Sequence, residues 1–103
     1  MAIRITVQYF TLLKRTIGTG KEEYELEEGE TVADLWIKIL KKFGAEMEKD
    51  GYIDAVTKEP KSIIIAMSRI GVLGLRHVGL YDGLKTELKD GDLIAMYPPV
   101  MGG

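Results

Sequence analysis

The sequence predicts an α+β fold in which one long helix packs across one mixed sheet. A helical stripe of apolar residues at 32–43 indicates the helix, and strand patterns occur near both ends of the chain. With 103 residues, 46% of them hydrophobic, the chain can fill one core. We therefore expect a single domain over residues 1–103.

The first strand is expected at residues 3–9, where apolar and polar residues alternate. Its apolar members are Ile3, Ile5, Val7 and Tyr9. A short helical or irregular crossover at 10–18 follows, and Gly18 closes it. Residues 23–26 predict a second strand that pairs with the first as a loose hairpin.

The clearest element is a helix from Thr31 to Phe43. Its apolar residues form one continuous helical stripe, made of Val32, Leu35, Trp36, Ile39, Leu40 and Phe43. Thr31 followed by Asp34 is typical of a capping box, and Gly44 supplies the residue expected just after a helix. We interpret the stripe, Trp36 included, as core packing.

The second half of the chain is harder to divide. Residues 45–61 are polar and contain turn signals, so we expect a loop excursion from the core fold. Residues 63–65 form a buried-strand run, and residues 70–75 fit either its bent continuation or a separate strand. Residues 93–97 are apolar on both faces, which predicts a last strand in the interior of the sheet.

The composition excludes several classes of function. A formal net charge of −2 gives no general affinity for nucleic acids or anionic membranes. No apolar run reaches the ~20 residues that a membrane helix needs, and no secretory signal opens the chain, so we expect a cytoplasmic protein. The absence of cysteine excludes disulfides, thiolate metal sites and cysteine nucleophiles. The single His77 cannot hold a metal alone; we expect it at the surface or on an edge strand, and expect no metal site.

The chain closes in a short tail, Pro98-Pro99-Val100-Met101-Gly102-Gly103. The two prolines cannot donate to a sheet ladder, so they end the last strand and stiffen the base of the tail. The two glycines leave a carboxylate on a thread without side chains, which can enter a channel too narrow for Cβ atoms. We expect residues 98–103 to form a flexible functional tail, ordered beyond Pro99 only inside a partner.

Four segments together resemble the MoaD/ThiS sulfur carriers, which have the ubiquitin-like β-grasp fold. The likeness is greatest to the MoaD group, the small subunits of molybdopterin synthase. The segments are Tyr9-Phe10 with Gly18, residues 29–35, residues 88–92 and residues 97–103. The most specific part is Asp-Gly-Asp, five apolar residues and then Pro-Pro-Val-x-Gly-Gly. The family usually has an Asn-Gly turn before the final loop, and the best candidate for it here, Gly74-Leu75, lacks the asparagine.

The resemblance implies a carrier and cosubstrate, not an enzyme. An adenylating enzyme of the ubiquitin-activating type uses ATP to convert the carboxylate of Gly103 into an acyl adenylate. A cysteine desulfurase or rhodanese-like sulfur donor then replaces AMP and leaves a thiocarboxylate. That sulfur passes to a cyclic pterin monophosphate in the large subunit of molybdopterin synthase, for the molybdenum or tungsten cofactor. The chain itself is expected to bind no cofactor.

The resemblance also implies that partners grip the sheet face near the tail through Phe10, Tyr81 and Tyr97, with core packing as the alternative for each. Three other functions stay open: a ubiquitin-like modifier that joins Gly103 to lysines of target proteins, a sulfur carrier for tRNA thiolation or thiamine, and a plain interaction domain. Pro98-Pro99 argues against the thiamine carrier, whose tail usually lacks that pair.

Overall fold

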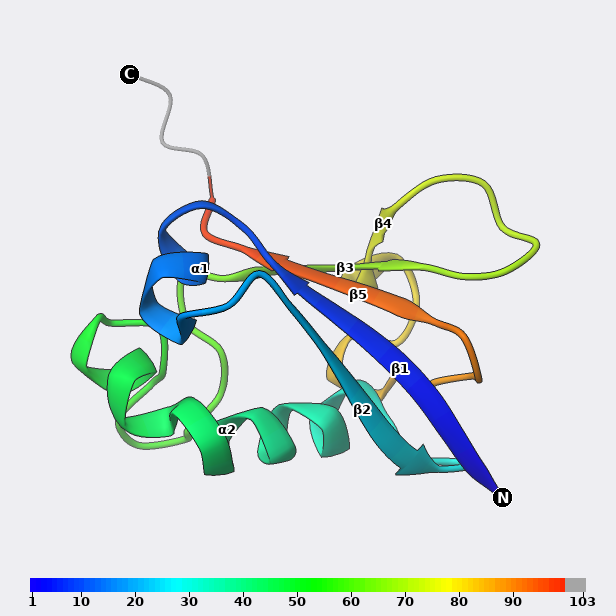
Figure 1. Cartoon of the computed structure of the whole chain (residues 1–103), viewed down its shortest axis with the longest axis horizontal. Helices are drawn as coiled ribbons and strands as arrows, with labels where there is room; N and C mark the ends of the chain where they lie inside the picture. Colours follow the sequence, from blue (N-terminus) through cyan, green and yellow to red (C-terminus); the bar gives the residue numbers. More distant parts are fainter. Residues whose placement is uncertain (100–103) are drawn as a thin grey trace.

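A computed structural model describes residues 1–99 of the chain. In this part, five strands form one mixed sheet, and a long helix lies across one of its faces (Figure 1). The strands are β1 (Ala2–Tyr9), β2 (Lys21–Glu27), β3 (Ile64–Ser68), β4 (Arg76–His77) and β5 (Leu93–Tyr97). The helices are α1 (Thr11–Ile17) and α2 (Val32–Lys49), and two short 3₁₀ turns are η1 (Val78–Leu80) and η2 (Gly83–Lys85). The predicted fold class is confirmed.

β5 lies at the centre of the sheet, whose strand order is β2-β1-β5-β3-β4. It runs parallel to β1 and antiparallel to β3, while β2 and β4 are antiparallel to their neighbours. The prediction of an interior last strand is therefore confirmed. Because β1 and β5 are parallel, their C-terminal ends meet at the same end of the sheet, where Tyr9 lies opposite Met96.

Side chains alternate along each strand, so the pairing register divides the sheet into two faces. The inner face carries the buried side chains of Ile3, Ile5, Val7, Tyr9, Tyr24, Leu26, Ile65, Met67, Ile94 and Met96. These side chains join the apolar side of α2 in one core. The opposite side of the central strands, called the outer face below, carries Thr6, Gln8, Ile64, Ala66, Ser68, Leu93, Ala95 and Tyr97.

The start of α2 follows the prediction. The Asp34 N–H donates to Thr31 Oγ1 at 3.4 Å, and the Thr31 N–H donates to Asp34 Oδ2 at 2.8 Å, which completes the capping box. Trp36 is buried, and its indole N–H donates to the carbonyl oxygen of Lys58 at 2.8 Å. The interpretation of Trp36 as a packing residue is confirmed, because its one polar atom is satisfied inside the fold.

The end of α2 differs from the prediction. The helix was expected to stop at Phe43, yet it continues through Lys49. Met47 is fully buried, so the apolar stripe extends for another turn and its burial stabilises the helix past Gly44. Gly51, at φ 84°, instead of Gly44, takes the left-handed conformation near the helix end.

The expected loop excursion at 45–61 is therefore too long. Its first residues belong to α2, and Tyr52 and Ile53 are buried in the core. Ile53 forms a bridge with Pro60, so the exposed excursion is the turn between them. Asp54 holds that turn by accepting hydrogen bonds from two backbone N–H groups, at 2.8 and 2.9 Å.

The remaining connections differ in how well they were predicted. The crossover after β1 is the helix α1, which ends at Gly18 as expected. Residues 70–75 form neither a continuation of β3 nor a strand of their own, but part of a loop that leads to the two-residue β4. His77 lies exposed on β4, at the edge of the sheet, as predicted.

Candidate functional site at the end of the last strand

The tail leaves the sheet at the C-terminal end of β5. The Phe10 N–H donates to the Met96 carbonyl oxygen at 3.1 Å and joins the first crossover to β5. Pro98 and Pro99 follow without backbone N–H groups, and Pro99 is exposed. The strand therefore ends at Tyr97, as predicted. The remaining tail positions named above, Val100, Met101, Gly102 and Gly103, lie outside the described residues.

Phe10 and Tyr97 meet at the base of the tail. Their rings are in a T-shaped arrangement, with centroids 6.5 Å apart and an interplanar angle of 79°. The contact follows from the parallel pairing of β1 and β5, which places the two residues at the ends of adjacent strands. Phe10 keeps 42% of its surface exposed, and Tyr97 is half-buried. An aromatic pair thus faces solvent where the tail begins.

Tyr81, the third residue expected at this surface, lies in a different cluster. It follows η1 and packs against the core, with the Arg69 guanidinium 5.9 Å from the centre of its ring. Arg69 comes directly after Ser68, which pairs with Leu93 at the opposite end of β5 from Tyr97. The structure therefore brings Phe10 and Tyr97 together and does not bring Tyr81 to them.

Asp92 fixes the start of β5 through a fully buried carboxylate. Arg69 donates to it from Nε at 2.9 Å and from Nη2 at 2.8 Å, and the Lys89 N–H donates at 2.8 Å. The hydrogen bonds with Asp92 raise the pKa of Arg69 above its usual value, against the opposing effect of burial. The Gly91 N–H donates to the Arg4 carbonyl oxygen at 2.9 Å, so the turn before β5 is joined to both neighbouring strands.

The Arg69–Asp92 pair was not predicted from the sequence. Asp90-Gly91-Asp92 indicates a turn in any fold, and no spacing rule links it to an arginine 23 residues earlier. A usable signal was nevertheless present. An acidic residue directly before a buried strand needs a compensating donor, and Arg69 stands just after the preceding buried run.

A second polar network lies on the inner face at the other end of the sheet, where β1 ends next to Met96 of β5. The hydroxyl groups of Tyr9 and Tyr24 both donate to Glu22 Oε1 at 2.9 Å, and Lys42 Nζ donates to Oε2 at 2.6 Å. Burial raises the pKa of Glu22, but the bonds from Lys42, Tyr24 and Tyr9 outweigh it and lower the pKa below its usual 4.5. Burial also raises the pKa of Tyr9. The network joins β1, β2 and α2 beside the residue that precedes Phe10.

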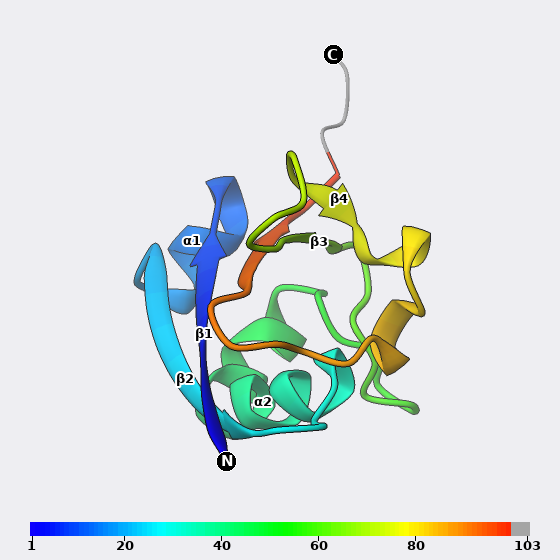
Figure 2. The same ribbon diagram turned by 90° about the vertical axis from the view of Figure 1, so that its right-hand side faces the viewer.

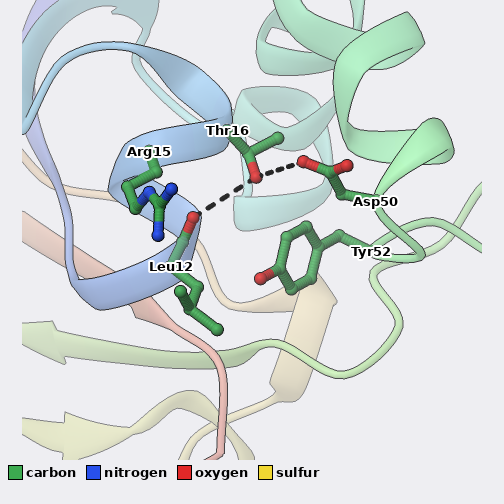
Figure 3. Close-up of a pocket in the computed structure, with 5 residues that line it drawn as sticks. All are labelled: Leu12, Arg15, Thr16, Asp50 and Tyr52. Atoms are coloured by element: carbon green, nitrogen blue, oxygen red, sulfur yellow. Dashed lines mark hydrogen bonds between the residues drawn. The ribbon is translucent and has the colours of Figure 1, made fainter.

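An open depression of about 360 Å³ lies between α1 and the turn after α2 (Figure 3). It is lined by Leu12, Arg15, Thr16, Asp50 and Tyr52. The Thr16 hydroxyl donates to Asp50 Oδ2 at 2.6 Å and joins the two helices. Its lining holds no residue of the predicted tail chemistry, so we do not place the functional site there.

Residues 1–99 contain neither a helix suited to cross a membrane nor a cluster of metal ligands. Neither helix there is both long and apolar enough to cross a membrane. No three histidine, aspartate or glutamate side chains of this part gather closely enough to hold a metal ion.

A model of the ThiS family matches residues 7–103, nearly the whole chain. The chain belongs to the ThiS family. It is thus a small ubiquitin-like sulfur carrier or modifier of the MoaD/ThiS type, a class of carriers and not of catalysts.

Solved structures agree with this ThiS-family assignment, although no curated protein matches the chain. A candidate molybdopterin converting factor, subunit 1, from Pyrococcus furiosus is 29% identical, with 95% of this chain and 99% of that chain covered and a TM-score of 0.68. SAMP1, the small archaeal modifier protein 1 from Methanosarcina acetivorans, is 27% identical, with 100% and 99% covered and a TM-score of 0.71. A chain of the Amycolatopsis orientalis BexX/CysO complex shares the fold at 24% identity, with 96% and 99% covered and a TM-score of 0.64. The expected β-grasp fold is confirmed.

Proposed function

We propose that this ThiS-family chain is the small subunit of a molybdopterin synthase and carries sulfur on the carboxylate of Gly103. The observation that carries the proposal is the position of β5. The central strand of the sheet runs directly into Pro98-Pro99 and then into the Gly-Gly tail, with Phe10 and Tyr97 at its base. The 29% identity to a candidate molybdopterin converting factor supports the choice of pathway.

The chemistry requires activation by another protein, because a carboxylate is a poor electrophile. In the proposed first step, a Gly103 carboxylate oxygen attacks the α-phosphorus of ATP, pyrophosphate leaves, and an acyl adenylate forms. A persulfide sulfur of the donor then attacks the acyl carbon and AMP leaves. A thiol cleaves the resulting S–S bond by supplying two electrons, which releases the thiocarboxylate. This chain contributes the reacting carboxylate and no catalytic side chain, and ATP is used by the activating partner.

The geometry at the base of the tail suits this role. The prolines fix two φ angles and cannot extend the sheet ladder, so they direct the chain out of the sheet. The two glycines carry no Cβ atoms and fit a narrow partner channel. The Arg69–Asp92 pair at the start of β5 and the Glu22 network beside Tyr9 hold the strands that aim the tail.

Three partner proteins follow from the proposal: the adenylating enzyme, the sulfur donor and the synthase large subunit, all in the cytoplasm. Phe10 and Tyr97 are their proposed anchor residues, because half-exposed aromatic side chains are favoured at the centre of interfaces. Tyr81, partly buried against the core beside Arg69, lies away from this pair, so Phe10 and Tyr97 carry the proposal.

The similarity to SAMP1 favours one second candidate, a protein modifier. In that role the same acyl adenylate would be attacked by a lysine amine of a target protein and would form an isopeptide bond. The two functions share every step up to adenylation, so they differ only in what consumes the activated tail.

The test is a reconstituted sulfur transfer. The chain, thiocarboxylated with ATP, the adenylating enzyme and a sulfur donor, is mixed with the large subunit and the cyclic pterin monophosphate. We expect its intact mass to return to that of the carboxylate while molybdopterin forms, and a chain never exposed to ATP to give no product. A thiocarboxylate that persists, together with isopeptide-linked adducts on other proteins, would favour the modifier.

A further inference from the structure

The loop between β3 and β4, residues 69–75, exposes three large apolar side chains. Ile70 is 80% exposed, Leu73 91% and Leu75 48%. A single exposed leucine is ordinary, but three such side chains within seven residues form a patch of the kind that marks an interaction site. This loop also contains Gly74-Leu75, the best candidate for the position of the Asn-Gly turn that is usual in the MoaD/ThiS family.

The start of the loop is held in place by hydrogen bonds and by packing. Arg69 donates to the buried Asp92 and, from Nη2 at 2.8 Å, to the Glu87 carbonyl oxygen. The Val72 N–H donates to the Arg69 carbonyl oxygen at 3.0 Å and closes a turn. The Ile70 side chain packs on Gly91, where an added Cβ would come within 2.8 Å of its Cδ1 atom. These contacts fix the first part of the loop, from Arg69 to Val72, although most of the Ile70 side chain is exposed.

The loop and the base of the tail lie on the same side of the sheet. Both Figure 1 and Figure 2 show them on the side away from α2, and Figure 1 shows the tail base at one end of β5 and the loop toward the other. At the centre of the outer face Ala66 pairs with Ala95, and these two small apolar residues are almost fully buried by their neighbours. β5 spans roughly 15 Å at about 3.3 Å per residue. An interface of about 800 Å² per partner is therefore wide enough to cover both ends.

Besides the tail base and loop 69–75, the outer face is bordered by β2, and this edge of the sheet is acidic. Residues 21–30 contain six glutamates and one lysine, in a chain whose net charge is only −2. The register places Glu23, Glu25 and Glu27 on the outer side of β2, and all three are exposed. Arg4 pairs with Glu23 at 3.5 Å, which leaves Glu25 and Glu27 without an ion pair within residues 1–99. A protein that covers the outer face therefore meets an apolar arm on one side and negative charge on the other.

We propose that loop 69–75 is a second docking arm for the adenylating enzyme that takes the tail. This inference rests on the proposed function. The enzyme presents an apolar cleft to Ile70 and Leu73 and basic side chains to Glu25 and Glu27. The tail supplies the reacting group, and the arm determines which activating enzyme accepts this chain. Hydrophobic contact sets the dissociation rate, and the charges set the association rate and its dependence on salt.

The test measures binding and adenylation with the adenylating enzyme from the same genome and ATP. Leu73→Asp should raise the KM of adenylation about tenfold or more with little change in kcat, because burying one leucine contributes that much to affinity. Val56→Asp is the matched control, since Val56 is 89% exposed on the excursion turn. Glu25→Lys should slow association at low salt, whereas Glu46→Lys on α2 should not.

The outcomes separate the two hypotheses. If the natural chain is not adenylated at all, the proposed function fails and the docking arm fails with it. If the natural chain is adenylated and folded Leu73→Asp has the same KM of adenylation, only the proposal of a docking arm is wrong. If the natural chain is a dimer and Leu73→Asp is a monomer in sedimentation, the loop binds a second copy and the proposal is overturned.

Discussion

Asp92 has a carboxylate with no solvent contact, and three donors satisfy it. Asp92→Ala leaves the Arg69 guanidinium, itself only 23% exposed, without its partner, so we expect the free energy of unfolding to fall by about 3 kcal/mol. Urea unfolding measures the change. Asp90→Ala is the control: it removes one exposed hydrogen bond, to the Arg4 N–H, and should cost about 1 kcal/mol. If both variants lose the same free energy of unfolding, the buried Arg69–Asp92 pair does not stabilise the fold as described.

Glu22 predicts a pH dependence of stability. Its pKa in the folded chain lies below 4.5, so the unfolded chain binds this proton more tightly. The carboxylate therefore contributes stability above pH 4.5 that is lost as the pH falls through its lower folded pKa. We expect Glu22→Gln to be less stable than the natural chain by about 1 kcal/mol at neutral pH, with a smaller difference at about pH 3. Urea unfolding at both values checks this, and a difference that grows in acid would contradict it.

The helix α2 shows what the sequence does and does not reveal about an element. Its capping box and apolar stripe are local patterns, and both were predicted correctly. Its end was predicted wrongly, because Gly44 is a local stop signal while the burial of Met47 depends on tertiary packing. The interior position of β5 was predictable from its two apolar faces. The conformation of loop 69–75 was not, because it depends on the long-range contacts of Arg69 and Ile70.

Because α2 continues past Gly44 and ends before Gly51, substitutions at these two glycines should have opposite effects on stability. Gly44→Ala should raise the free energy of unfolding by up to about 1 kcal/mol, because alanine is the better helix former and its Cβ meets only Leu40 Cβ, at 4.0 Å. Gly51→Ala should lower it, since φ 84° disfavours residues with a Cβ. Thermal and urea unfolding measure both variants. If Gly51→Ala is more stable and Gly44→Ala less stable than the natural chain, the result would favour a helix that ends at Phe43.

The paired ends of β1 and β5 carry the prediction about partners. Phe10→Ala removes the more exposed ring of the Phe10–Tyr97 pair. The affinity for the synthase large subunit should therefore fall about thirtyfold while the chain stays folded. Phe43→Ala is the matched control, because Phe43 makes a similar T-shaped contact with the buried Tyr9 and should affect stability instead. Calorimetric titration and thermal unfolding separate the two effects. Unchanged binding of Phe10→Ala would remove it from the interface.

Across the whole molecule, the sheet order supports the proposed carrier role, in which the end of the tail reacts instead of a side chain. Placing β5 at the centre fixes it through strands on both sides, so the base of the tail has one direction relative to the outer face. The tail motif was readable from the sequence because it is contiguous. The surface around it was only partly readable: Phe10 and Tyr97 meet through parallel pairing, whereas Tyr81 lies beside Arg69, a placement set by long-range contacts that no local pattern encodes.

The carrier role is tested most directly by intact-mass analysis of the chain with and without Gly103, after incubation with ATP, the adenylating enzyme and a sulfur donor. The full chain should gain the mass difference between one sulfur and one oxygen, and only when ATP is present. The shortened chain should gain nothing while unfolding at the same urea concentration, because its carboxylate ends about 3.5 Å short of the α-phosphate. Equal thiocarboxylate formation in both chains, or none in the full chain, would contradict the account.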